Sequence, residues 1–379
     1  MANTLTNLIP EVYSALDVVS RELVGFIPAV TRDPMTERAA VDQTVRSFVA
    51  PAVTAGDITP GVTPPDDGDQ TIGNVSLTIT KARRVPIRWN GEQSLGVNNG
   101  GPGQRAILQA QIQQAIRTLT NEMEADLAGL HIASSRAYGT AGTTPFGTAG
   151  DYTDASNARK ILVDNGAPTS DMHLVVNTAA GANLRGKQGG RGVDAEGDSR
   201  LLRQGVLLDV HGFALRESAQ VITNTAGTGA SYLINGTLAV GATTITVDTG
   251  SGTVLAGDIV TIAGDTNKYV VATALSGGSF TIGAPGLLKA PADNAAVTVV
   301  AAAARNMAFA RSALILATRA PALPEGGDSA VDRTLITDPV SGITFELAMY
   351  AQYRQMQYEL SAAWGVKCVK PEHTAILLG

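Results

Sequence analysis

Apolar residues recur at spacings of three and four along two segments, which predicts two amphipathic helices. The first covers residues 4–24. The second follows Pro102 and runs to about residue 130, with Gly129 near its end. At 1.5 Å per residue, about 28 residues make a rod of about 40 Å. The apolar positions of this long helix are Leu108, Ile112, Ile116, Leu119, Met123, Leu127 and Leu130.

Other segments alternate apolar with polar residues and predict strands. Between residues 224 and 302, short runs of Thr, Val and Ile are cut by Gly, Asp or Asn, as in small antiparallel sheets. Two further alternating runs, at 74–80 and 82–89, predict the arms of one long exposed hairpin. The stretch 50–73, crowded with Gly, Pro and Asp, leads into that hairpin as a loop.

The β-rich stretch differs in composition from its flanks. No Arg occurs between Arg216 and Arg305, no Glu between Glu217 and Glu325, and residues 224–302 also lack His and Cys. This predicts a small β domain inserted into a host whose halves are residues 100–223 and 303–379, and an insert without His, Cys, Arg or Glu is not where an enzyme would keep its chemistry. Its candidate core is Ile245, Val247, Ile259, Ile262, Val270, Phe280 and Ile282.

The flanks mix helix and strand, so the fold class is α+β. Residues 154–168 predict a short helix ended by Gly166 and Pro168, and residues 173–178 predict a buried strand. Near the C-terminus the pattern predicts two strands around a turn at Trp364–Gly365.

Charge narrows the function classes. The chain has 28 Lys and Arg against 34 Asp and Glu, a net charge of −6 and a pI near 5.3. A dedicated DNA-binding protein carries a basic stripe instead, so this chain fits a surface that faces nucleic acid without holding it. Four cations cluster on one predicted arm, Lys81, Arg83, Arg84 and Arg88. They form either a solvated face or a contact with an acidic patch on a neighbouring subunit.

One segment imitates a nucleotide site. Residues 181–188, GANLRGKQ, match the glycines and lysine of a phosphate-binding loop, and Asp209 ends an apolar run as a second acidic element would. Gln188, however, lacks the hydroxyl that would ligate Mg²⁺, and GGRG at 189–192 interrupts the required helix. We therefore expect a Gly-rich surface loop, and keep an NTPase built on Lys187 and Asp209 as the alternative from another class.

Other candidate chemistry is weak, so we expect no catalytic, cofactor or metal site. The histidines His131, His173, His211 and His373 have no metal-ligand spacing. The single Cys368, in an apolar run, excludes a disulfide and predicts a buried inert thiol. The acidic segment 64–69 lacks the spacing of a Ca²⁺ loop. No stretch reaches the ~18 apolar residues of a membrane span, and the N-terminus lacks a secretory pattern.

The order of elements resembles the major capsid proteins of tailed double-stranded DNA bacteriophages with the Hong Kong 97 type of fold. The resemblance rests on the arm, hairpin and long helix, then KILVDNGAPTSDMHLVVNTAAGANL, GVLLDVHGFALRES and the ending AAWGVKCVKPEHTAILL. The interrupting β segment resembles the β-barrel inserted in the coat proteins of short-tailed podoviruses. The resemblance implies an N-terminal arm (1–49), an extended hairpin loop (50–99), a peripheral and axial core (100–223 and 303–379) and an inserted β domain (224–302).

The same resemblance implies a structural function without catalysis. The chain would assemble with itself into pentamers and hexamers of an icosahedral head around double-stranded DNA, which it would contact without sequence specificity. Its partners would include a portal protein, and it would not interact with a membrane. Because the chain begins close to its first helix, we expect a separate scaffolding protein. Assembly is expected in the bacterial cytoplasm and the product in the virion. A cellular nanocompartment shell of the same fold is the other structural reading.

Overall fold

The computed structural model describes residues 24–33, 38–49, 55–63, 68–99, 103–148, 151–189, 207, 209–338 and 341–379. The helix predicted over 4–24 and most of the segments 64–69 and 189–192 lie outside these residues. Within the described part of the chain, no helix combines the length and the apolar character needed to cross a membrane.

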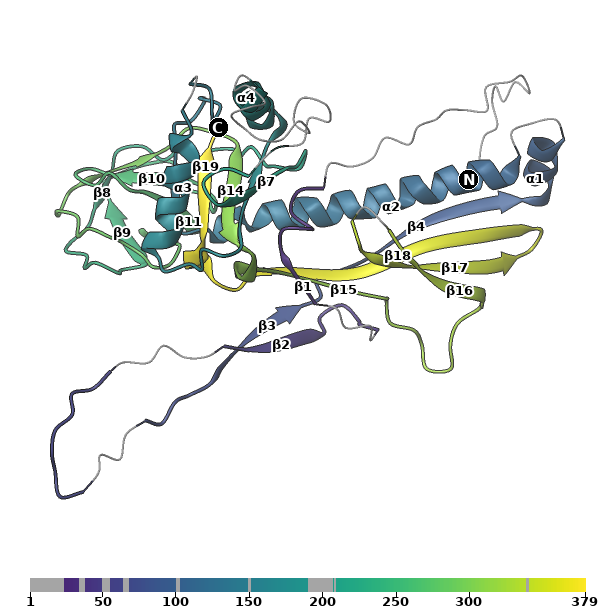
Figure 1. Ribbon diagram of the computed structural model, residues 1–379, viewed down its shortest axis with the longest axis horizontal. Coiled ribbons are helices and arrows are strands. Elements are labelled where there is room, and N and C mark those ends of the chain that lie inside the picture. The colour runs from purple at the N-terminus through teal and green to yellow at the C-terminus, as the bar shows by residue number, and fades with distance from the viewer. Residues whose placement is uncertain are drawn as a thin grey trace.

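One helix runs between the two ends of an elongated molecule (Figure 1). Helix α2 (Gln104–Gly129) has 26 residues, so it is about 39 Å long. Its buried side chains Leu119, Met123 and Leu127 repeat at a spacing of four and pack into the largest core of the molecule. The apolar periodicity of the sequence therefore predicted this helix correctly.

A six-stranded sheet packs along α2. Its long central strand, β18, pairs with β4 on one side and with β17 and then β15 on the other. The buried Leu360 and Trp364 of β18 belong to the same core as the buried face of α2. The strands are β1 (Thr31–Asp33), β15 (Leu314–Arg319), β18 (Gln355–Cys368), β17 (Thr344–Gln352), β16 (Ala330–Thr337) and β4 (Lys81–Asn90).

The turn predicted at Trp364–Gly365 is wrong, because both residues lie inside β18. A Cβ atom on Gly365 would come within 2.1 Å of the Thr78 carbonyl oxygen. This glycine therefore permits a close approach of two backbones rather than a turn. The chain reverses between β17 and β18, at Tyr353 and Arg354.

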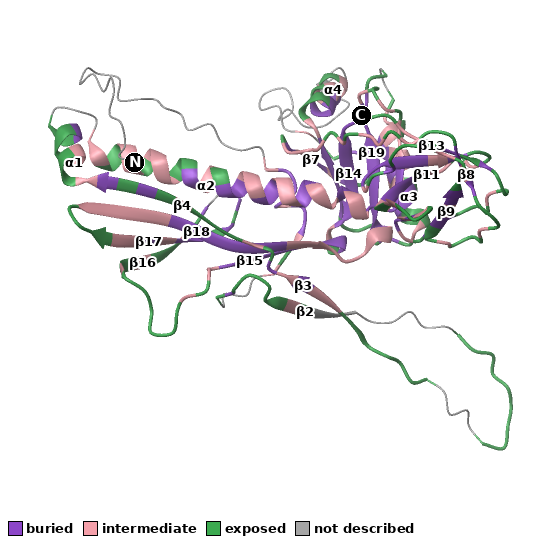
Figure 2. Ribbon diagram, turned by 180° about the vertical axis from the view of Figure 1, so that it is seen from behind, coloured by how far each residue is buried: buried purple, intermediate pink, exposed green. Residues whose placement is uncertain are grey.

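The two strands predicted to form one hairpin do not pair with each other. Strand β3 (Gly73–Thr78) pairs with β2 (Thr44–Val49), not with β4, and residues 50–72 connect the two strands. Strand β4 pairs with β18 in the six-stranded sheet. Period-two alternation identifies a strand but not its partner, and both candidate partners alternate. The arm of β2 and β3 projects away from the body, with an exposed loop (Figure 2).

A second sheet of eleven strands forms the other end of the molecule, and six of its strands close on themselves. The ring β10-β13-β8-β9-β12-β11 is closed by the pairing of β10 with β11 and forms a barrel. The barrel strands are β8 (Tyr232–Ile234), β9 (Thr244–Asp248), β10 (Ile259–Ile262), β11 (Lys268–Ser276), β12 (Ser279–Ile282) and β13 (Ala296–Val299). The chain therefore has an α+β fold with a barrel of short strands, as predicted.

The barrel continues directly into the host sheet through β11 and β5. The C-terminal strand β19 lies between β5 and β14, so the last residues of the chain are at the centre of this layer. The remaining strands are β5 (Arg136–Tyr138), β19 (Thr374–Leu378), β14 (Arg305–Ala310), β6 (Met172–Val176) and β7 (Phe213–Glu217). The other helices are α1 (Gly91–Asn98), α3 (Thr153–Asp164) and α4 (Thr178–Gly189), with short 3₁₀ turns at Leu130–Ala133, Arg311–Ala313 and Pro371–His373.

Two of the seven predicted insert-core residues belong elsewhere. Ile245, Val247, Ile262, Phe280 and Ile282 lie in the apolar cluster of the barrel. Ile259 and Val270 are buried but pack instead against Ala137, Ile376 and Leu378 of the host. Side chains of a strand alternate between its two faces, so a buried β10 has one apolar face inward and one toward the host.

Candidate interaction surfaces

The loop of the β2–β3 arm exposes apolar side chains to solvent. Ile58 and Val62 are 98% and 105% exposed, and Ile72 near the start of β3 is 70% exposed. Burial of these side chains against a partner would be favourable by about 25 cal/mol for each Å² of apolar surface removed from water. No other described residue covers them, so these apolar side chains are open to solvent.

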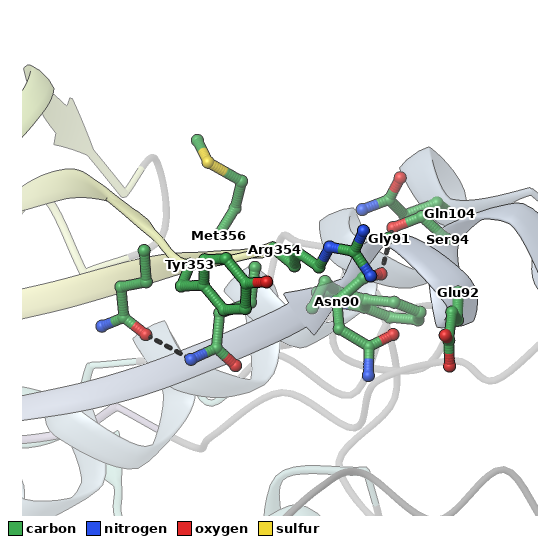
Figure 3. A pocket seen from close by; sticks show the side chains of 11 residues that line it. Asn90, Gly91, Glu92, Ser94, Gln104, Tyr353, Arg354 and Met356 are labelled. Atoms are coloured by element: carbon green, nitrogen blue, oxygen red, sulfur yellow. Dashed lines mark hydrogen bonds between the residues drawn. The ribbon is translucent and has the colours of Figure 1, made fainter.

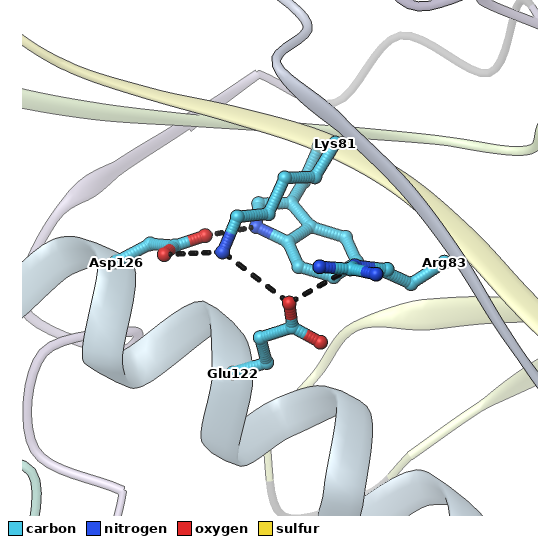
Figure 4. A network of polar contacts seen from close by, with 5 residues as sticks. Lys81, Arg83, Glu122 and Asp126 are labelled. Atoms are coloured by element: carbon cyan, nitrogen blue, oxygen red, sulfur yellow. Dashed lines mark hydrogen bonds and ion pairs between the residues drawn. The ribbon is translucent and has the colours of Figure 1, made fainter.

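The four cations predicted as contact residues each interact with other residues of the same chain. Lys81 Nζ binds Asp126 Oδ1 at 2.8 Å and Glu122 Oε1 at 3.3 Å, and Arg83 Nε binds the same Glu122 oxygen at 3.1 Å (Figure 4). The indole Nε1 of Trp364 donates to Asp126 Oδ2 at 2.8 Å. This network fastens β4 and β18 to α2.

The acidic groups beside Lys81 favour the charged form of its amine. Partial burial lowers its pKa, but the hydrogen bonds and charges of Asp126 and Glu122 leave the pKa raised above the ordinary value. The geometry thus gives Lys81 a structural role.

Arg84 and Arg88 follow on the other face of β4, because successive side chains of a strand alternate. Arg84 Nη1 binds Glu359 Oε2 of β18 at 2.7 Å, and Arg88 also has a partner in the chain. The sequence predicted either a solvated face or a contact with a neighbouring subunit. The structure pairs Lys81, Arg83 and Arg84 with acidic groups of the same chain, while the side chains of Arg83 and Arg84 stay 58% and 60% exposed.

Glu124 is an important residue that sequence analysis missed. It lies on α2 with no exposed surface, and its two oxygens accept hydrogen bonds from the backbone N–H groups of Phe26 and Ile27, both at 3.0 Å. Ser218 Oγ, at the end of β7, donates to the same carboxyl at 3.2 Å. This one side chain joins the start of the described chain to α2 and to the second sheet. A glutamate between the buried Met123 and Leu127 was the available signal.

Glu124 predicts a specific pH dependence of stability. Burial raises its pKa to about 7, despite the hydrogen bonds from Ile27 and Phe26. Because the pKa of Glu124 is higher in the folded chain than in the unfolded chain, its protonated form stabilises the fold. This contribution to the free energy of unfolding is complete below the unfolded-state pKa and is lost as pH rises through 7. We expect the ionisation of Glu124 alone to lower the free energy of unfolding by about 3 kcal/mol between pH 5 and pH 8.

The measurement is urea unfolding of the wild-type chain and of Glu124→Gln between pH 5 and pH 8. The variant keeps an acceptor oxygen but cannot ionise, so the difference in unfolding free energy between the two proteins should shift in favour of Gln as pH rises. A difference that stays constant across this range would show that Glu124 does not titrate there.

A groove lies at the far tip of the six-stranded sheet, between the end of β4, the start of α1 and the β17–β18 turn (Figure 3). Its volume is about 780 Å³. Asn90 caps α1 by accepting from Gln93 N at 2.7 Å, and Gln93 Oε1 accepts from Asn90 N at 3.2 Å. This capping box fixes one wall of the groove.

The nucleotide-site alternative is wrong. Residues 181–188 lie inside helix α4, and Gly181 N donates to Asn177 O, so the backbone does not form an open phosphate-binding loop. Lys187 Nζ donates to Asp151 O at 2.6 Å and lies 5.7 Å from the ring centres of both Phe146 and Tyr152. The predicted Gly-rich surface loop is therefore also wrong over this range.

The histidines and the cysteine have local environments without shared chemistry. Across the described ranges, no group of three or more His, Cys, Asp or Glu is placed to hold a metal ion. Burial lowers the pKa of His131, His173 and His373, which favours their neutral forms. Burial also raises the pKa of the Cys368 thiol to about 12, as expected for an unreactive cysteine.

Comparison with known proteins relates this architecture to viral shells. No family model and no curated protein matches the sequence. Among solved structures, the chain is similar to the capsid structure of the cyanophage P-SCSP1u, with a TM-score of 0.52, 12% identity and coverage of 100% of this chain and 92% of that one. The fold is that of a phage capsid protein.

Two further structures are similar at lower scores. One is from Mycobacterium phage Che8, with 14% identity, a TM-score of 0.47 and coverage of 99% and 98% of the two chains. The other is the capsid of a native GTA particle, with 9% identity, a TM-score of 0.48 and coverage of 100% and 95%. At such identities the comparison with the cyanophage capsid shows the capsid fold and nothing finer.

Proposed function

We propose that this chain is a structural shell subunit, the major capsid protein of a tailed double-stranded DNA phage, without catalytic activity. The observation that carries the proposal is the capsid fold along the whole chain, with an arm whose loop exposes Ile58 and Val62 to solvent. A subunit of this shape gains by burying the arm against a copy of itself. Repetition of that contact around symmetry axes gives pentamers and hexamers.

The partners follow from this role. The chain assembles chiefly with itself, and we propose a separate scaffolding protein, a portal protein and packaged DNA as the other partners, with assembly in the bacterial cytoplasm and the final place in the virion. The net charge of −6 supports contact with DNA that is weak and independent of sequence. The podovirus type of coat protein is supported by the barrel formed within residues 224–302.

The proposal is tested by expressing the full-length chain with and without a candidate scaffolding protein and measuring its sedimentation. Large uniform particles are the expected product. A chain that sediments only as a monomer under both conditions would contradict a shell role.

A charge reversal tests the contact role proposed for the basic strand. Arg83→Glu with Arg84→Glu should leave the subunit folded, because partly exposed ion pairs seldom contribute more than about 1 kcal/mol each. It should reduce the yield of particles, since the new charges recur in every copy. Circular dichroism measures the fold and sedimentation the particles, with Lys160→Glu on α3 as the matched surface control. Normal particle yield from the double variant would remove these arginines from the interface.

A further inference from the structure

The barrel is joined to its host by two chain crossings that lie side by side. Thr223 of the entering crossing forms an antiparallel bridge with Ala304 of the leaving crossing. We call residues 222–224 and 303–305 the neck. Arg305 ends the neck and begins β14, so this residue lies where the barrel and the host meet.

The guanidinium group of Arg305 is buried without a hydrogen-bond partner. The residue is 1% exposed, and its Nε, Nη1 and Nη2 atoms are all buried and form no hydrogen bond with any described residue. Burial lowers the pKa of Arg305 to about 10, because desolvation disfavours the charged form, so the group still carries its charge at neutral pH. Removal of a cation from water is strongly unfavourable unless an acceptor or an anion compensates it. The position therefore favours a negatively charged ligand.

Asp258 is the acidic group whose charge acts on Arg305, but its oxygens are engaged by other donors. This fully buried carboxylate accepts from Asn224 Nδ2 at 3.0 Å, from Gly227 N at 3.1 Å and from Leu255 N at 2.7 Å. No N–H group of Arg305 donates to it. Asp258 therefore organises the barrel side of the neck and leaves the donors of Arg305 unused.

Two further buried polar atoms without partners belong to the segment that follows α2. The 3₁₀ turn Leu130–Ala133 packs against β11 of the barrel and β19 of the host. His131 Nδ1 lies 3.1 Å from Ala128 O, whereas His131 Nε2 and Ser134 Oγ form no hydrogen bond within the part of the chain that the structure describes. Burial lowers the pKa of His131, and the charge of Arg305 lowers it further, as expected for neighbouring side chains. A hydroxyl group and a protonated imidazole are donors from which an anion can accept.

We propose that Arg305 binds a small inorganic anion of the chloride class, enclosed at the neck between barrel and host. The charge selects an anion, because the N–H donors around a positive centre have no acceptor among the described residues. Burial selects a small one, because at 1% exposure a peptide carboxylate or a nucleic-acid phosphate cannot reach the guanidinium without opening the neck. The site goes beyond the proposed shell function and does not depend on it.

Thermal melting of the full-length chain in two salts tests the site. Chloride is exchanged for gluconate, an anion too large for the enclosed site, at constant ionic strength, so that surface charges are screened equally. We expect the wild-type melting temperature to be higher in chloride by about 3 °C or more, because a ligand that binds only the folded chain stabilises it.

The decisive variant is Arg305→Met, which keeps an unbranched apolar stem and removes the charge. It should melt at the same temperature in both salts. Arg84→Met is the matched control at an arginine whose side chain is 60% exposed, and it should retain the chloride effect. A chloride effect of equal size in wild type and in Arg305→Met would overturn the proposal.

Bromide locates the anion and needs no variant, so the test stands even if Arg305→Met does not fold. Wild-type crystals soaked in bromide should give an anomalous scattering peak within hydrogen-bond reach of the Arg305 guanidinium. A water molecule there without anomalous signal, in crystals that show bromide at other places, would reject the anion site.

Discussion

Replacing residues 50–72 by Asn-Gly should leave the subunit folded and abolish particle formation. Val49 pairs with Gly73 at the end of the β2–β3 ladder, so a two-residue turn closes the hairpin without changing its register. Asn-Gly favours the turn type that matches the twist of a hairpin. The substitution removes the exposed Ile58, Val62 and Ile72, which we propose pack against a neighbouring copy.

The expected loss is large because in the proposed shell the arm makes a contact that recurs in every subunit, and its removal leaves no substitute. Circular dichroism and thermal melting should match the wild-type subunit, and sedimentation should show monomers or small oligomers. The matched control is Ile58→Thr with Val62→Thr, which keeps the loop but removes its apolar groups, and should give an intermediate yield. Wild-type numbers of particles from the shortened arm would show that the arm does not mediate assembly.

Val260→Asp should unfold the barrel, whereas Ile259→Asp should only separate it from its host. Val260 is fully buried in the barrel core, and an unpaired carboxylate there costs about 4 kcal/mol or more. A barrel of about 80 residues is only marginally stable, so this cost is decisive. Ile259, one residue earlier, faces Ile376 and Leu378 of the host.

The two variants are compared in the full-length chain and in a fragment of residues 224–303. We propose that the fragment folds alone and gives dispersed amide signals in NMR. Val260→Asp should abolish the dispersion, while Ile259→Asp should retain it, because residue 259 faces solvent once the host is removed. In the full-length chain both should lower soluble yield. A wild-type fragment without dispersed signals would show that the barrel is not an independent domain.

The different environments of the neighbouring residues Ile259 and Val260 show the limit of structure prediction from sequence patterns. The long helix could be predicted because its apolar residues repeat at helical spacing over 26 positions. The partner of β4 could not, because alternation is shared by every candidate strand. Ile259 and Val260 are both apolar and both buried, so only the three-dimensional arrangement separates docking surface from barrel core.

The candidate surfaces were only partly predictable for a related reason. The cluster of Lys81, Arg83, Arg84 and Arg88 is visible in the sequence, but its acidic partners on α2 and β18 are remote along the chain. Glu124 and Arg305 gave weaker signals, since their burial is a property of the folded chain. The spacing of Lys187 from two glycines matches that of a phosphate-binding loop, yet these residues lie within helix α4.

Electron microscopy of the expressed full-length chain tests the central claim most directly. With a scaffolding protein present, we expect closed hollow shells of uniform diameter. A reconstruction should show pentamers and hexamers in icosahedral order, with the β2–β3 arm of each subunit lying on its neighbour. Monodisperse single subunits under the same conditions, or particles in which the arm touches only its own subunit, would contradict the account.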